Sequence, residues 1–139
     1  MITHDGTIHA FCRWDRYGNH VTGYNANTLG IAFNGNFETN PAISSSNPDG
    51  RFGAPVPTEK QVIAAARITA LWTFLYEIPL DFSKSIIPHK DIADKACPGS
   101  SFSYDIYKKT IERFCSKWQN SSYVKEKIEA YKLKPYLYV

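Results

Sequence analysis

The chain has 139 residues, of which 43% are apolar and 14% aromatic, so it is long enough and apolar enough to form one globular domain. This composition excludes a disordered or fibrous protein. Sixteen Lys and Arg against thirteen Asp and Glu give a net charge of +3, and the basic residues are scattered along the chain. No nucleic-acid partner is indicated, although a mild positive balance suits an anionic polymer.

Cysteine usage excludes two further classes. Cys12, Cys97 and Cys115 are odd in number and include no close pair such as CxxC, so neither a disulfide framework nor a four-cysteine zinc site fits. For Cys12 and Cys115 we expect buried apolar thiols.

No targeting or membrane segment is predicted. The N-terminus has no basic segment followed by an apolar run, so no signal peptide is visible and synthesis in the cytoplasm is expected. Residues 62–80 are apolar enough to raise the question of a membrane span. Arg67 and Glu77 interrupt this run, and capping signals before it indicate a buried helix instead.

The first predicted element is a β-hairpin. Asp5 and Gly6 supply the positive dihedral angles of a two-residue loop, and alternating residues flank it. Ile8, Ala10 and Cys12 would face one side of the second strand. That strand is longer than its partner before the turn, which indicates that the chain begins inside a strand. The alternative is a hairpin that is short on one side.

The segment LGIAFNGNF, residues 29–37, predicts a central strand. Three larger apolar residues alternate there with Gly30 and Ala32, whose small side chains allow close packing. Residues 40–57 are rich in Asn, Ser, Pro and Gly and predict an exposed loop, either a lid or an ornament.

Thr58 and Gln61 form a capping box that predicts the start of a helix, and apolar residues then repeat at helical spacing until Pro79. The predicted apolar stripe of this helix is Ala64, Ile68, Leu71, Leu75 and Ile78. Residues 85–88 predict a short apolar strand. Two further helices are predicted, over about residues 104–117 and 123–133.

A histidine and a cysteine eight residues apart stand in the segment IIPHKDIADKACPGS. Catalytic zinc takes three protein ligands and leaves a fourth position for water, whose pKa falls to about 7. His89 at the end of a strand and Cys97 beside a turn fixed by Pro98 and Gly99 are suitable donors for one ion. Lys95 would then place a positive charge beside a developing oxyanion. Taken alone, however, the pair favours a solvated histidine with a buried thiol, and Lys95 a solvent-facing charge.

Four segments read together carry a family resemblance. HDGTI, HVTGYNANTLGIAFNGNF, PTEKQVIAAARITAL and PHKDIADKACPG resemble, in order and spacing, the zinc-dependent N-acetylmuramoyl-L-alanine amidases, which include phage lysozyme-type amidases and share a fold with peptidoglycan recognition proteins. The resemblance covers about residues 2–103. It implies an α/β fold with a mixed central β-sheet flanked by helices and a zinc site in a cleft across the strand ends. We expect an amidase-like domain over residues 1–118 and a C-terminal helical extension over residues 119–139.

The resemblance also implies the chemistry. The family hydrolyses the amide between the lactyl group of N-acetylmuramic acid and the L-alanine of the stem peptide, using a zinc-activated water. By position, His89 and Cys97 match two of the three zinc ligands, and Lys95 matches the lysine proposed to stabilise the tetrahedral intermediate. His20 matches a histidine of the cleft wall near the substrate, with a loop histidine in water as the alternative. Asn25 is expected to hold the turn before the central strand.

The chain departs from the family pattern at its N-terminal side. The family's first zinc-ligating histidine and a catalytic tyrosine precede the DGT hairpin, and residue 1 falls after both. Some relatives carry a catalytic glutamate at the position of Asn34, an amide that cannot act as a base. His4 and His9 lie on or beside the hairpin turn and are not placed to replace the histidine. We therefore expect an N-terminally incomplete domain with an uncovered edge or face available for self-association.

The sequence thus predicts a zinc hydrolase of cell-wall degradation, an endolysin-type amidase from a phage or bacterium that acts on peptidoglycan. Two alternatives stay open: a non-catalytic module that binds muropeptide, and a fragment that is active only with a complementing segment. His89, Lys95 and Cys97 together favour an enzymatic ancestor, since binding alone does not require them.

Overall fold

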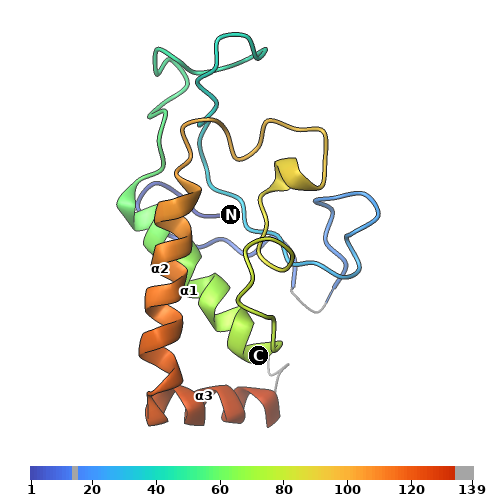
Figure 1. The fold of residues 1–139 in the computed structure, drawn as a ribbon, viewed down its shortest axis with the longest axis vertical. Helices are drawn as coiled ribbons and strands as arrows, with labels where there is room; N and C mark the ends of the chain where they lie inside the picture. Colours follow the sequence, from blue (N-terminus) through green and yellow to red (C-terminus); the bar gives the residue numbers. More distant parts are fainter. Residues whose placement is uncertain (14–15, 134–139) are drawn as a thin grey trace.

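Three helices form one side of the molecule and long loops form the other (Figure 1). The computed structural model describes residues 1–13 and 16–133. The elements are α1 (Glu59–Leu75), the 3-10 turn η1 (His89–Asp91), α2 (Tyr104–Gln119) and α3 (Ser122–Leu133). α1 and α2 lie side by side, and α3 runs across their lower ends in Figure 1, in contact with both. None of these helices is both long and apolar enough to cross a membrane.

The predicted mixed central β-sheet is wrong for the part of the chain that the structure describes. Instead of strands, two isolated bridges form through Ile2, an antiparallel one to Ile8 and a parallel one to Phe33. Ile2 N donates to Ala32 O and Asn34 N donates to Ile2 O, both at 2.8 Å. Ile2 is buried, but Ile8 is 50% exposed, so the apolar alternation lacks the buried face that would extend the pairing. In the described chain, backbone hydrogen bonds flank the Ile2–Ile8 bridge at Met1–His9 on one side and at Thr3–Thr7, where the turn begins, on the other.

The predicted strand at residues 85–88 is replaced by a turn. The backbone N–H groups of Ser85 and Ile86 both donate to Asp81 O, at 3.0 and 2.9 Å. Ile86 O accepts a hydrogen bond from the Tyr104 hydroxyl at 2.6 Å. Because these backbone groups already have partners, they are not available to a neighbouring strand.

The hairpin turn is confirmed, but its loop has a different length. Gly6 N donates to Thr3 O at 2.8 Å and Thr3 N donates to Thr7 O at 3.0 Å, so three residues rather than two close the turn. Within the loop only Gly6 has a positive φ, +86°, as in a type I turn followed by a G1 bulge. The side chains of Thr3 and Thr7 and the Thr7 backbone N–H donate to the Asp5 carboxylate and hold its pKa well below its ordinary value.

α1 begins where the capping box predicted. Thr58 Oγ1 accepts from Gln61 N at 3.1 Å, and Gln61 Oε1 accepts from Thr58 N at 3.0 Å. The helix ends at Leu75, earlier than the periodicity suggested. The buried face of the helix differs from the predicted stripe, because Ala64 and Ile68 of that stripe are only partly buried, at the edge of the core. The buried side chains of α1 are Gln61, Val62, Ala65, Ala66, Thr69 and Ala70.

Aromatic rings connect α2 to the loop side of the core. The ring of Phe33 lies 5.0 Å from that of Phe102 and 5.9 Å from that of Tyr107, both edge to face. The Tyr107 hydroxyl lies 2.6 Å from Thr69 Oγ1 of α1, and burial raises the pKa of Tyr107 to about 12. Tyr107 therefore ties both long helices to the segment before them.

The two expectations for buried thiols have opposite outcomes. Cys115 is buried, as predicted, and its sulfur lies 3.7 Å from Thr73 Oγ1. Cys12 is exposed, so that prediction is wrong. Among the described residues, the hydrogen-bond partners of the Cys12 thiol are nearby backbone carbonyl oxygens, including Arg13 O at 3.4 Å.

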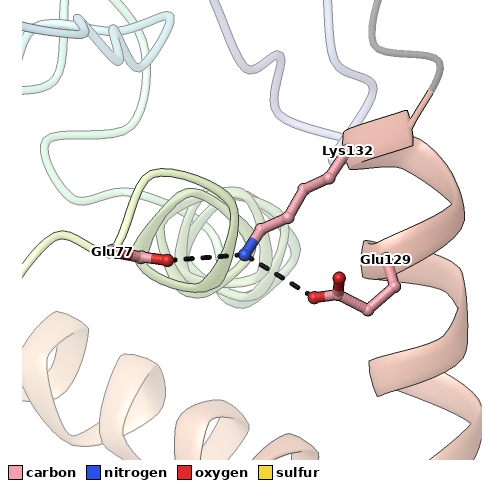
Figure 2. A network of polar contacts seen from close by, with 3 residues as sticks. All are labelled: Glu77, Glu129 and Lys132. Atoms are coloured by element: carbon pink, nitrogen blue, oxygen red, sulfur yellow. Dashed lines mark ion pairs between the residues drawn. The ribbon is translucent and has the colours of Figure 1, made fainter.

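α2 and α3 lie within two residues of their predicted bounds. α3 packs against the rest of the protein through Ile128, which is 8% exposed. Lys132 adds ion pairs to Glu77, just beyond α1, and to Glu129 in its own helix, each at 3.6 Å (Figure 2). Both carboxylates are well exposed, so these pairs contribute little, and Ile128 is the main anchor of α3.

Residues 40–57 form a loop without helix or strand, as predicted, and the loop projects from the top of the molecule in Figure 1. One buried side chain, Asn47, organises it. Asn47 Nδ2 donates to Asn36 O at 3.0 Å and to Gly53 O at 2.9 Å, and its Oδ1 accepts from Phe52 N at 3.0 Å. The loop therefore has an internal framework that its composition did not reveal.

Candidate functional site

The segment that carries the two predicted metal ligands folds back on itself. η1 starts at His89, whose carbonyl oxygen accepts from the N–H groups of Ile92 and Ala93. Lys90 N then donates to Cys97 O at 2.9 Å, which joins the two ends of the segment. His89 and Cys97 are thus brought to neighbouring backbone positions. Their role as ligands stays a prediction.

The chemical groups of this segment are accessible. His89 is half-buried, whereas Lys95 and Cys97 are exposed. Surrounding atoms still cover part of the Cys97 thiol, and this burial raises its pKa. Because Cys97 is exposed, the alternative prediction that it is a buried thiol is wrong. An imidazole and a thiol on one folded-back segment are the donor types that zinc takes.

A pair of hydrogen-bonding residues clamps the end of this segment to a distant part of the chain. Ser100 Oγ donates to Glu38 Oε1 at 2.6 Å, and Ser100 N donates to Glu38 Oε2 at 3.2 Å. Ser101 N donates to Phe37 O at 2.9 Å. This clamp could not be predicted from the sequence, because its partners lie 62 residues apart and no local pattern joins them. The clamp positions the backbone just beyond Cys97.

The clamp is expected to be pH-dependent. The Ser100 hydroxyl, and next the Asn40 backbone N–H, lower the pKa of Glu38 below its ordinary value of 4.5 because both donate to the charged carboxylate. With a lowered folded-state pKa, Glu38 stabilises the folded protein above the unfolded pKa. This stabilisation is lost as the pH falls through the folded-state value.

We therefore expect the free energy of unfolding to fall more steeply for the wild-type protein than for Glu38→Gln between about pH 5 and pH 3. The glutamine variant keeps an acceptor oxygen but has no charge to titrate. Urea unfolding at the two pH values measures the slopes. Parallel slopes would show that the Glu38 charge does not stabilise the clamp.

Gly99 makes the closest backbone approach in the clamp. The Cys97–Pro98 peptide bond is cis, and Gly99 follows with a φ of +103°. A Cβ atom at Gly99 would lie 2.4 Å from the carbonyl carbon of Phe37. Only glycine fits both the dihedral angle and the contact.

Gly99→Ala is expected to lower the free energy of unfolding by about 2–3 kcal/mol, because a left-handed alanine is strained and its methyl group meets backbone. Gly53→Ala is the matched control, since Gly53 has a φ of +97° but open space around the added Cβ. Urea unfolding of both variants separates the contact with Phe37 from the dihedral strain. Equal losses would mean that the close approach at Gly99 has no energetic effect.

His20 lies in a separate turn. His20 Nε2 is 2.7 Å from Thr28 Oγ1, and a Cβ atom at Gly30 would lie 3.1 Å from His20 Cγ. Asn25 Oδ1 accepts from His20 N at 2.9 Å and from Val21 N at 2.8 Å, which confirms that Asn25 holds this turn. No hydrogen bond or ring contact among the described residues joins His20 to the segment with the predicted ligands. A substrate contact by His20 stays a prediction.

The donor set for a metal is incomplete in the described part of the chain. No three side chains of His, Cys, Asp or Glu are grouped there to hold an ion. His4 and His9 line a shallow depression of about 560 Å³ with Asp5 on the hairpin, and they form no such group. His89 and Cys97 fit zinc in donor chemistry, and as predicted ligands they would account for two of the three that a catalytic zinc takes.

A cavity of about 290 Å³ borders the same segment. Its lining residues are Phe82, Pro88, Lys90, Asp91, Pro98, Gly99, Phe102, Tyr104 and Lys108. Lys108 Nζ lies 5.1 Å from the ring centroid of Tyr104 and 5.8 Å from that of Phe82. Pro88 and Pro98, the neighbours of the two predicted ligands, thus border open space rather than packed core.

Comparison with known proteins gives two kinds of match. Residues 1–100 match the sequence profile of a protein family described as N-acetylmuramoyl-L-alanine amidase. Similar proteins include an endolysin of Klebsiella phage KP32, 29% identical over 99 residues, and an endolysin of Enterobacteria phage K11, 33% identical over 113 residues. The alignments cover 70% and 81% of this chain but 55% and 63% of those relatives, so the chain spans less than two thirds of their length. No solved structure matches the chain significantly.

Proposed function

Because this chain belongs to the N-acetylmuramoyl-L-alanine amidase family, we propose that it hydrolyses the amide bond between N-acetylmuramic acid and L-alanine in peptidoglycan. The reaction would take place at the folded-back segment that carries His89, Lys95 and Cys97. The supporting observation is the Lys90–Cys97 backbone hydrogen bond, which brings a nitrogen donor and a sulfur donor to neighbouring positions within the family-matched region. Peptidoglycan is then the partner and the bacterial cell wall the place of action.

Zn²⁺ is the cofactor of this proposal. His89 and Cys97 would hold it, as two ligands of the set that a catalytic zinc needs. Bound there, zinc would polarise the amide carbonyl and lower the pKa of water to about 7. The incomplete donor set in the described chain makes zinc content the first quantity to measure.

The remaining roles belong to side chains of the chain itself. Lys95 is exposed two residues before Cys97, where its ammonium group can approach the amide oxygen as negative charge develops on it. The Glu38–Ser100 clamp holds the backbone behind Cys97, so the sulfur donor keeps its place when substrate binds. His20 would contact the sugar or peptide beside the reacting amide. Asn34 is an amide and supplies no general base.

The direct test combines zinc analysis with an assay on purified peptidoglycan. We expect the purified chain to bind zinc and to release stem peptides, and we expect a chelator to stop the release. A chain that retains muropeptide but releases no stem peptide, with or without added zinc, would overturn the enzymatic proposal. That result would support the second candidate, a non-catalytic muropeptide-binding module. This candidate is kept because no three metal-binding side chains are grouped in the described part of the chain.

A further inference from the structure

The positive charge of the protein is concentrated in its C-terminal part. Residues 1–103 contain eight Lys and Arg against nine Asp and Glu, whereas residues 104–139 contain eight against four. The whole net charge of +3 therefore comes from the part of the chain that follows the proposed reaction site. The basic residues are scattered along the sequence, but the balance of charge changes at the start of α2: it is slightly negative before the helix and positive from the helix onward.

Three of these cations form one stripe on α2. Lys109, Arg113 and Lys117 are spaced four residues apart, so they lie on the same side of the helix. All three are exposed, whereas Ile111 and Cys115, two residues further along from Lys109 and Arg113, are buried on the opposite side. We call these three cations the basic stripe. In Figure 1, α2 stands at the outer edge of the molecule, beside α1.

The basic stripe is available to an external anion. Among the described residues, none of the three cations takes part in an ion pair, although Asp105 and Glu112 lie on one flank of the stripe. Successive charges are about 6 Å apart along the helix, less than the Debye length of about 8 Å at physiological ionic strength. Their fields therefore overlap and attract an extended anion more strongly than isolated charges would.

The basic stripe has a defined position relative to the proposed site. α2 begins five residues after Gly99, and Ser103 caps it by accepting a hydrogen bond from Ile106 N at 3.4 Å. The clamp at Ser100 holds the intervening chain. A polymer docked on the stripe would therefore lie along α2, the helix that begins just after the proposed reaction site.

We propose that the basic stripe docks the protein on the carboxylate-rich peptides of peptidoglycan, outside the reaction site. The inference rests on the proposed function, and it assigns α2 a part in holding the insoluble substrate. Single-stranded nucleic acid fits this surface less well, because it needs exposed aromatic rings on which bases stack. The aromatic residues of α2 pack instead against the core: Tyr104, Tyr107, Phe114 and Trp118.

Charge reversal tests the stripe with a matched control. The stripe variant carries Lys109→Glu, Arg113→Glu and Lys117→Glu. The control carries Arg67→Glu, Lys125→Glu and Lys127→Glu, which replace three exposed cations of α1 and α3. The control therefore has the same net charge as the stripe variant. Co-sedimentation with purified peptidoglycan at about 50 mM NaCl should show at least tenfold weaker binding for the stripe variant than for the control. The difference should shrink at about 500 mM NaCl, where salt screens the charges.

A soluble muropeptide assay separates this inference from the proposed function. Cleavage of a soluble muropeptide should be the same in wild type, stripe variant and control, because the stripe lies outside the reaction site. Equal loss of sedimentation in both variants would overturn the inference, since net charge alone would then explain it. Unchanged sedimentation of the stripe variant would also overturn it, as would tighter stripe-dependent binding to a single-stranded oligonucleotide than to peptidoglycan. Sedimentation needs no catalysis, so it reports on the stripe even if the chain cleaves nothing.

Discussion

Replacing Cys97 with serine is expected to lower both the zinc content of the protein and the release of stem peptides by at least about 100-fold. A serine hydroxyl stays neutral where a thiolate would bind the metal, so the ligand is lost while the size of the side chain is nearly kept. His89→Ala should have the same effect, because it removes the other donor. The measurements are zinc per mole of purified protein and chromatography of the peptides released from peptidoglycan.

Cys12→Ser is the matched control for this experiment. Cys12 is also an exposed cysteine, and it lies in the segment after the hairpin, so its substitution should leave zinc content and release unchanged. Lys95→Met should keep the zinc but lower the release, since Lys95 is proposed to stabilise charge rather than to bind metal. If Cys97→Ser kept both zinc and release, the assignment of Cys97 as a ligand would be wrong.

The helices could be predicted because their signals are local. The Thr58–Gln61 capping box forms within four residues, so it fixed the start of α1 correctly. The buried face of α1 is predicted less well, because helical spacing alone places Ala64, Ile68, Leu71, Leu75 and Ile78 on the inner face. In the structure the alanines take the inner positions, where their small side chains let α2 pack closely.

The sheet could not be predicted from alternation alone. Alternation of apolar residues over residues 29–37 indicated a strand, but a strand also needs neighbours that cover its apolar face. Only Phe33 of this segment forms a bridge, and Ile8 on the other side of Ile2 is half exposed. Sequence patterns report which residues can face a core, and they do not report whether a partner covers them.

In the proposed site, too, features within one segment could be predicted, whereas contacts between distant segments could not. The spacing of His89, Lys95 and Cys97 is visible in the sequence, as is the need for glycine near the turn. The residues that hold the turn in place are not visible, because Glu38 and Ser100 meet only after folding. Of the residues that support the site, Gly99 could be predicted from the sequence as part of the turn. The structure adds the reason for glycine there, which is that a Cβ atom would clash with the Phe37 backbone.

Gln61 joins three parts of the fold that are far apart in the sequence. Its Nε2 donates to Ile2 O at 3.0 Å and to Asn34 O at 2.9 Å, while its Oε1 accepts from Thr58 N. The side chain is fully buried. The capping box revealed one of these three bonds, and the other two connect α1 to the bridges that replace the predicted sheet.

Gln61→Leu is expected to lower the free energy of unfolding by about 2–5 kcal/mol, because it removes the Gln61 hydrogen bonds to Asn34 O and Thr58 N at about 1–3 kcal/mol each, while Ile2 O keeps the bond from Asn34 N. Urea unfolding followed by circular dichroism measures the change. The other glutamine of the chain, Gln119, is exposed at the end of α2, and Gln119→Leu should change stability by less than about 0.5 kcal/mol.

Gln61→Glu separates hydrogen bonding from packing at the same position. A carboxylate there would face the carbonyl oxygens of Ile2 and Asn34, which disfavour its charged form and raise its pKa. The resulting destabilisation is absent below the unfolded pKa of about 4.3 and complete above the raised folded-state pKa. Relative to wild type at the same pH, Gln61→Glu should therefore be much less destabilised near pH 4 than near pH 7, whereas Gln61→Leu should lose the same amount at both. Equal, pH-independent losses in the two variants would mean that Gln61 stabilises the fold by filling space, and that its bonds to the bridged segments contribute little.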